Sequence, residues 1–327
     1  MPKGHLILAA VLLAVMLAVP AAAIPGTGTA TDTPRPAADG AGTGKTVTVL
    51  RADTGTVETV TWHNYVFGVM AAESDPAQPD AALQAQAVAA CTLALYRRAQ
   101  RQTDPPAALR GADVTDDSGV DQGYITRPVA RAKWGAKADA YERRLDELVA
   151  GVLGWVLTYE GQPAMTVYHA VSAGRTESAQ NVWGGAVPYL VPVESVGDLT
   201  SPGYLSEKTF TKAEFVQALA ALDPAVNDPS AGDPVGAVHR STGGTVLTIT
   251  LFGRSFTGGQ VRQALGLRSA NFDVAVADDA VKLTVRGYGH LVGMSQYGAG
   301  TMAEQGSTWQ EILAWYYPGC RLEKIKI

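Results

Sequence analysis

The chain has little cysteine, few aromatic residues and little charge. Two of its 327 residues are cysteine, which excludes a disulfide-rich scaffold and a structural zinc site made of cysteines alone. Aromatic residues make up 7% and charged residues 17%, and the net charge of −5 argues against a protein held on nucleic acid by bulk charge. The composition also excludes collagen-like, coiled-coil and polytopic membrane proteins.

The one long apolar run stands at the N-terminus. Lys3 and His5 precede 14 apolar residues, Leu6 to Val19, and a small-residue cleavage motif follows Pro20. This order predicts that residues 1–23 are a signal peptide. Because the apolar stretch reaches 19 residues at Ile24, an uncleaved signal anchor is the alternative. We therefore expect an exported, extracytoplasmic protein that is either secreted or tethered to the cytoplasmic membrane through residues 6–24.

The remaining chain predicts a short linker and one large folded region. Residues 24–45 are rich in Gly, Thr, Pro and Ala without apolar periodicity, which is typical of disorder. Residues 46–327, roughly 280 residues with ample apolar content, can bury a sizeable core. They predict an α+β fold, a single compound domain with a substrate groove and an inserted lobe near residues 200–285. The expected helices cover about 63–73, 79–101, 129–153, 212–222 and 309–316, and the expected strands lie in 45–61 and at about 155–159, 165–170, 245–252 and 281–286.

Glu73 is the first candidate for chemistry. It continues the apolar stripe of the helix HNYVFGVMAAE and stands at its C-terminus, where the helix dipole disfavours an anion. Burial and dipole should both raise its pKa, as a general acid near neutrality requires. The alternatives are a partly buried Glu paired with an Arg, or a frayed helix end.

Two further blocks carry polar residues on glycine-rich segments. RGYGHLVGMSQYGAGTMAEQG is expected to form a tight loop that presents side chains suited to sugar hydroxyls and amides. The second block is YHAVSAGRTESAQNVWGGAVPYL. The alternatives are an ordinary glycine-rich turn for the first block and an ordinary strand–loop for the second. The candidate residues are His290, Ser295, Gln296 and Tyr297 in the first block, and His169, Ser172 and Arg175 in the second.

Together these blocks resemble the stage II sporulation protein D family. The resemblance begins with HNYVFGVMAAESDPAQPDAALQAQAVAACTLAL and continues, in the family's order, through YHAVSAGRTESAQNVWGGAVPYL, VRQALGLRSANFDV and RGYGHLVGMSQYGAGTMAEQGSTWQEILAWYYPGC. It covers about residues 45–325. Four ordered blocks are far more specific than one short motif.

The resemblance implies a peptidoglycan lytic transglycosylase that acts on glycan strands stripped of their stem peptides by an amidase. It places the catalytic acid on Glu73, in the AAE motif. That residue would protonate the oxygen leaving N-acetylmuramic acid, then activate the muramic O6 hydroxyl to close a 1,6-anhydro ring. The seven polar residues of the two blocks would bind the substrate, and no cofactor is implied. The alternatives are a non-catalytic glycan-binding enhancer of a partner N-acetylmuramoyl-L-alanine amidase, or an inert anchored scaffold.

The sequence departs from the family pattern at several positions. Some members bind zinc through His and Cys in and after the YH…SG block, but His169 stands there without a nearby Cys, so we expect no such metal site. Leu291 replaces the Gly of the family's GHGVG. Cys91 stands where the family usually has Arg, and Cys320 follows a YYPG motif that usually precedes another residue. Either the two cysteines form one disulfide or they are two separate thiols.

Overall fold

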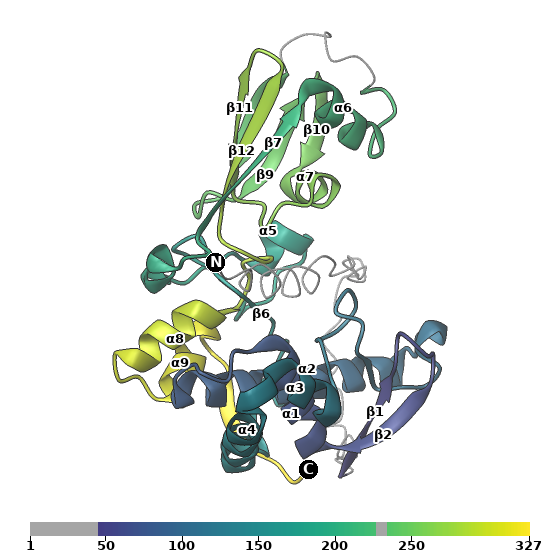
Figure 1. The fold of residues 1–327 in the computed structure, drawn as a ribbon, viewed down its shortest axis with the longest axis vertical. Helices are drawn as coiled ribbons and strands as arrows, with labels where there is room; N and C mark the ends of the chain where they lie inside the picture. The colour runs from purple at the N-terminus through teal and green to yellow at the C-terminus, as the bar shows by residue number, and fades with distance from the viewer. Residues whose placement is uncertain (1–44, 227–233) are drawn as a thin grey trace, which may run out of the picture. The chain divides into compact units, whose positions relative to one another are not determined.

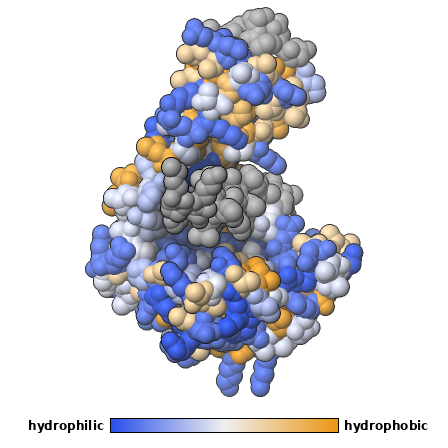
Figure 2. Space-filling model, viewed as in Figure 1, coloured by the Kyte–Doolittle hydropathy of each residue, from blue (hydrophilic) through white to orange (hydrophobic). Residues whose placement is uncertain are grey.

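The computed structural model describes residues 45–226 and 234–327, and these form helices and sheets together, as the α+β prediction requires (Figure 1). The expected signal segment and most of the linker lie outside the described residues. Within the described ranges, no helix is long and apolar enough to cross a membrane. On the face seen in Figure 2, hydrophilic and hydrophobic residues are interspersed over the surface.

The described chain divides into two compact units. The first holds residues 45–166 and returns for Cys320–Ile327, and the second is Val167–Gly319. The boundary follows strand pairing: the last strand of the chain pairs antiparallel with a strand of the first unit, Leu322 opposite Leu157. The expected lobe near 200–285 lies entirely within the second unit.

The first unit packs helices against two small sheets. The predicted hairpin is present, and the strand-to-helix corner that follows is capped by the Thr61 side chain, which accepts from the Asn64 N–H. The interior is apolar, with Trp62, Tyr65 and Phe67 almost fully buried. The helix predicted over 129–153 is broken at Gly135, whose φ of 55° is a conformation that favours glycine. The elements are β1 (Thr46–Leu50), β2 (Val57–Thr61), α1 (Trp62–Glu73), α2 (Asp80–Thr103), η1 (Ala107–Leu109), β3 (Val114–Thr115), α3 (Arg127–Trp134), η2 (Gly135–Lys137), α4 (Ala138–Val152), β4 (Trp155–Tyr159), β5 (Gln162–Pro163) and β14 (Arg321–Lys324).

In the second unit, the strand at its start pairs with a strand that lies about 125 residues further along the chain. The strand expected at 165–170 has only two residues, and it pairs in parallel with a two-residue strand that begins at Met294. Gln296 starts a helix where a tight loop was expected. That helix forms because the Ser295 side chain caps it, accepting from the Gly298 N–H. These elements are β6 (Tyr168–His169), α5 (Ala179–Trp183), η3 (Val196–Thr200), β13 (Met294–Ser295), α8 (Gln296–Glu304) and α9 (Trp309–Tyr316).

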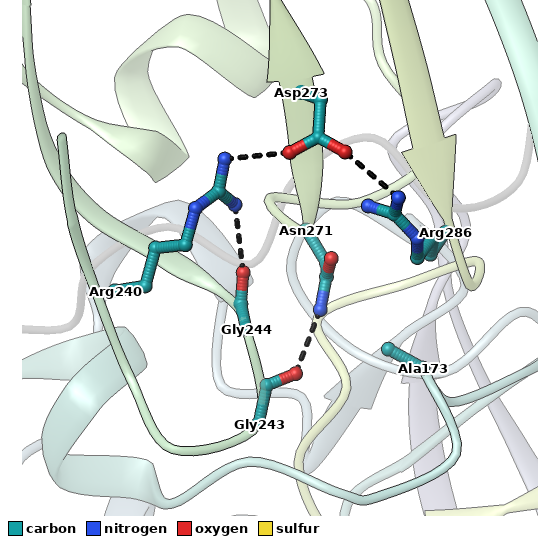
Figure 3. Close-up of a pocket in the computed structure, with 7 residues that line it drawn as sticks. All are labelled: Ala173, Arg240, Gly243, Gly244, Asn271, Asp273 and Arg286. Atoms are coloured by element: carbon teal, nitrogen blue, oxygen red, sulfur yellow. Dashed lines mark hydrogen bonds and ion pairs between the residues drawn. The ribbon is translucent and has the colours of Figure 1, made fainter.

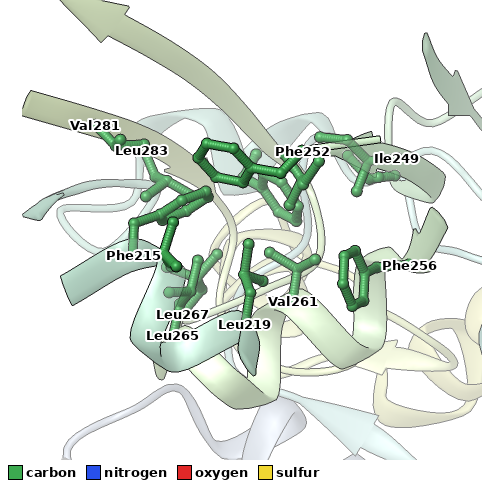
Figure 4. Close-up of a cluster of buried hydrophobic side chains, with 14 of the residues drawn as sticks. Phe215, Leu219, Ile249, Phe252, Phe256, Val261, Leu265, Leu267, Val281 and Leu283 are labelled. Carbon is green, nitrogen blue, oxygen red and sulfur yellow. The ribbon is translucent and has the colours of Figure 1, made fainter. Parts of the chain in front are cut away.

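The middle of the second unit has a hydrophobic core of its own. Two three-stranded sheets, ordered β10-β9-β8 and β11-β12-β7, pack with helices α6 and α7. Figure 4 shows Phe215 and Leu219 of α6 beside Val261 and Leu265 of α7, all turned toward side chains from the strands. The elements are β7 (Leu205–Thr211), α6 (Lys212–Ala220), β8 (Val235–Arg240), β9 (Val246–Leu251), β10 (Arg254–Thr257), α7 (Gly258–Leu265), β11 (Phe272–Ala277) and β12 (Ala280–Arg286).

Candidate active site

Glu73 is the last residue of α1, and the helix ends there for local reasons. The Ser74 N–H donates to the Met70 carbonyl at 3.0 Å, and Ser74 itself is extended, with ψ of 154°. Asp75 and Pro76 follow, and a proline disfavours helical conformation in the residue before it. The apolar face of α1 is buried, which carries the Glu73 side chain to the edge of the core.

A glycine in α1 brings a loop against the carboxyl group of Glu73. A Cβ on Gly68 would overlap the ring of Tyr124, so only glycine lets this loop lie flat on the helix. The Ile125 N–H then donates to the Gly68 carbonyl at 3.2 Å, and Tyr124 stacks on Tyr65 at 5.6 Å between ring centroids. The loop thereby points the backbone N–H of Gly123 at Glu73, donating to Oε1 at 2.6 Å.

Lys133, on α3, caps the C-terminal end of α1. Its Nζ donates to the carbonyls of Ala71 at 2.8 Å and Ala72 at 3.2 Å. The ammonium group thus satisfies carbonyls that the end of a helix leaves unpaired, and it offsets the dipole that was expected to act on Glu73. Burial lowers the pKa of Lys133, while the charge of Glu73 opposes that shift.

Burial raises the pKa of Glu73 from 4.5 to about 7. The Gly123 N–H and the charge of Lys133 both act in the opposite direction, and they limit the rise. Of the two causes expected from sequence, burial is therefore the one that dominates. The result is a carboxyl group that is part protonated at neutral pH, which suits a residue that must first donate and then accept a proton.

In the second unit, the structure brings the two other candidate blocks together. Tyr168 and His169 of β6 pair with Met294 and Ser295 of β13, and the rings of His169 and His290 lie 5.7 Å apart. The backbone of Val292 orients both rings: its carbonyl lies 3.1 Å from His169 Nδ1, and its N–H donates to His290 Nδ1 at 3.1 Å.

Both histidines are held neutral. Burial lowers the pKa of His169 to about 4, and burial together with the charges of His169 and Arg262 lowers the pKa of His290 well below its usual range. His169 is fully buried, and its Nε2 has no hydrogen-bond partner among the described residues. His290 is half-buried and packs 5.2 Å from the ring of Trp183. Of the two, only His290 has surface to offer a ligand.

Ser172 and Ser295, both expected to bind substrate, are instead fully buried around Asp198. The Ser172 N–H donates to Asp198 Oδ2 at 3.0 Å, and the Ser295 hydroxyl donates to Oδ1 at 2.8 Å. Burial raises the pKa of Asp198, although these bonds oppose the rise. Neither serine has surface for a sugar to contact. In this structure both stabilise the fold of the second unit through their hydrogen bonds to Asp198.

The remaining candidates differ in exposure. The side chain of Arg175 is 42% exposed and pairs with Glu194 at 3.1 Å. Gln296 is 9% exposed, whereas the half-buried Tyr297 directs its hydroxyl to the carbonyl of Thr200 at 3.5 Å. Arg175 and Tyr297 thus stay available for contact, and Gln296 is nearly covered.

Comparison with known proteins decides the family. Residues 51–159 match the family model described as stage II sporulation protein. Stage II sporulation protein D of Bacillus subtilis (strain 168) is 36% identical over 296 residues, which cover 89% of this chain and 83% of that protein. The chain belongs to the stage II sporulation protein D family. The protein of that name from Bacillus amyloliquefaciens is 35% identical over 274 residues, or 84% of this chain and 77% of that protein.

A more distant relative in Bacillus subtilis (strain 168) is named amidase enhancer. It is 26% identical over 234 residues, which cover 56% of this chain and 33% of that protein. Together with the family match, this similarity supports a sporulation role connected with the cell wall.

Three residues that depart from the family pattern can be located in the structure. Leu291, in place of a family glycine, adopts a φ of 68°, a region in which side chains are strained. Cys91 and Cys320 are free thiols in this structure, which corresponds to the alternative of two separate thiols. Burial raises the pKa of each to about 12. No group of three or more His, Cys, Asp or Glu in the described ranges is placed to hold a metal ion.

Sequence reasoning did not find the residues that position the candidates. Gly123 and Lys133 act on Glu73 from a loop and a helix at least 50 positions away, and no local pattern marks them. Asp198 sits in an unremarkable ESVGDLT segment.

Proposed function

We propose that this chain is an exported peptidoglycan lytic transglycosylase. It cleaves the bond between N-acetylmuramic acid and N-acetylglucosamine in glycan strands without stem peptides, in septal wall remodelling during sporulation and engulfment. A partner amidase supplies these strands. The observation that carries the proposal is the carboxyl group of Glu73, whose pKa burial raises to about 7 and whose Oε1 is fixed by the Gly123 N–H.

One carboxyl group suffices for this reaction. With Oε1 accepting from Gly123, Oε2 carries the acidic proton and transfers it to the glycosidic oxygen as the bond to the muramic C1 breaks. The resulting carboxylate then takes the proton of the muramic O6 hydroxyl, and O6 bonds to C1. The proton lost in the first step is regained in the second, so Glu73 is regenerated without water. Hydrolases that use water need a second carboxylate for this purpose.

The alternative is a non-catalytic glycan-binding module that stimulates an amidase. One observation favours it: the similarity to a protein named amidase enhancer. It does not account for the tuned carboxyl group, because a binding module has no need of a Glu that is part protonated at neutral pH.

The test is incubation with glycan strands freed of peptides, followed by mass analysis for 1,6-anhydromuramic ends. Wild type should produce them and Glu73→Gln should not. Glu147→Gln, on the exposed side of α4, is the matched control and should cleave as wild type does. If Glu73→Gln cleaves equally well, the assigned acid is wrong. If neither protein cleaves but both bind strands and stimulate an amidase, the alternative function holds.

A further inference from the structure

A polar pocket of about 280 Å³ opens on the second unit, among strands that the proposed mechanism does not use. Figure 3 shows the carboxylate of Asp273 between two guanidinium groups, with a glycine turn and an amide below them. The lining comes from the end of β8, the turn after it, the start of β11 and the end of β12. The lining residues are Ala173, Arg240, Gly243, Gly244, Asn271, Asp273 and Arg286.

The two arginines of this pocket differ in how many of their donors are occupied. Arg240 donates to the carbonyls of Gly244 and Phe272, each at 2.9 Å, and to Asp273 Oδ1 at 2.8 Å. Arg286 makes one side-chain hydrogen bond, from Nη2 to Asp273 Oδ2 at 2.7 Å. Its Nε and Nη1 have no hydrogen-bond partner within the described chain. Arg240 is therefore structural, and Arg286 retains donors for a ligand.

The free donors of Arg286 suit a single small anion. The side chain of Arg286 is 34% exposed, and its charge and that of Arg240 are shared with the carboxylate of Asp273. A second acidic side chain, Glu177, is buried behind the turn, its Oε2 lying 3.7 Å from where a Cβ on Gly243 would stand, so the pocket has no strong positive field. Binding then depends on directed N–H donors rather than on bulk potential. A planar carboxylate can accept two parallel hydrogen bonds from a guanidinium edge.

The proposed substrate presents a carboxylate of this kind at every second sugar. The lactyl carboxyl of a muramic acid residue is an uncharged amide while a stem peptide is attached. It becomes a free carboxylate once an amidase removes that peptide. We propose that this pocket binds the free lactyl carboxylate of a muramic acid residue through Arg286 and so selects strands without peptides. The proposal rests on the proposed function for its choice of ligand.

The experiment compares binding of two strand preparations of equal length. One has free lactyl carboxyl groups, and in the other each carboxyl is converted to its methylamide. Binding is measured on the full chain carrying Glu73→Gln, so that strands stay intact. The free acid should bind about tenfold more tightly, the difference expected for one charge-assisted contact. Adding Arg286→Gln should abolish the preference, Arg286→Lys should retain part of it, and Arg254→Gln, on an exposed ion-paired arginine outside the pocket, should leave it unchanged.

Several outcomes would overturn the proposal: equal binding of both preparations, a preference that survives Arg286→Gln, or no binding of either. Circular dichroism of each variant checks that the fold is retained, and Arg286→Lys provides a second test if Arg286→Gln unfolds. The outcome is separable from that of the proposed function. If no anhydromuramic ends form but binding shows a preference for free-acid strands that requires Arg286, the transglycosylase proposal is refuted and the pocket proposal is supported. If anhydromuramic ends form but no such binding preference is found, the pocket proposal is refuted and the transglycosylase proposal is supported.

Discussion

The raised pKa of Glu73 has a consequence for stability that can be measured without substrate. The pKa of this carboxyl is about 7 in the folded chain, against 4.5 for an ordinary Glu. Between these two values the folded state binds more protons than the unfolded state, so the free energy of unfolding falls as the pH rises through this window. The full loss is about 3 kcal/mol, reached above the folded pKa.

Glu73→Gln removes this dependence with little change of shape. The amide keeps an oxygen that can accept from the Gly123 N–H, and it cannot ionise. Below pH 4.5 the variant and wild type should have similar stability, because the carboxyl group is protonated in both states. Above pH 7 the variant should be more stable by about 3 kcal/mol, since it no longer buries a carboxylate.

Urea unfolding on both sides of this window, followed by circular dichroism and tryptophan fluorescence, measures the difference. Where the two compact units unfold separately, the transition of the first unit is the one to compare. Glu147→Gln, on the exposed side of α4, is the matched control for the loss of one carboxyl group. A difference for Glu73→Gln that does not change with pH would refute the reasoning. A variant that became less stable than wild type at high pH would also refute the reasoning. In that case the fold would stabilise the carboxylate of wild-type Glu73 rather than destabilise it.

Three further predictions concern the neighbours of Glu73 and the frame of the second unit. Gly123→Ala places a Cβ 2.7 Å from Glu73 Oε1 and should lower the cleavage rate about 100-fold with the fold retained, whereas Gly151→Ala, with its nearest neighbour at 4.0 Å, should have no effect. Lys133→Met removes the charge that lowers the pKa of Glu73, so the alkaline limb of the pH–rate profile should move to higher pH. Asp198→Asn should destabilise the second unit by about 2–4 kcal/mol in thermal or urea unfolding, because an amide nitrogen cannot accept the hydrogen bonds that converge there.

The elements that sequence predicted well are those whose stabilising contacts are local. The hairpin before α1, the helix ending at Glu73 and the helix beginning at Trp309 all have caps or turns within a few residues. Strands β7, β8 and β11 were missed. Distance along the chain explains only β7, whose partner β12 begins at Ala280, because β8 and β11 each pair with the next strand. The segment after Ser295 was expected to be a loop on account of its glycines, yet Gly298 serves there to let a helix pack closely. Glycine content alone did not distinguish these two uses.

In the candidate site, too, the sequence predicted what depends on local pattern and missed what depends on packing between distant segments. Glu73 could be found from sequence because helical periodicity shows which face it continues, and burial follows from that face. The pairing of the two polar blocks could be expected only through the family resemblance. Whether Ser172 faces a ligand or Asp198 depends on packing between segments that are far apart, and no local pattern encodes it. Residue type indicated polar chemistry at these positions but not the direction of the side chains.

The pKa of Glu73 results from opposed contributions, and their balance explains the local design. Burial alone would raise the pKa further and would leave an acid that donates poorly and a base that forms only at alkaline pH. The Gly123 N–H and the Lys133 ammonium both stabilise the carboxylate and bring the pKa back toward neutrality. A residue that acts as acid and then as base in one turnover is most effective when both forms are accessible at the working pH. Moving either neighbour should therefore slow one half of the reaction while leaving the carboxyl group in place.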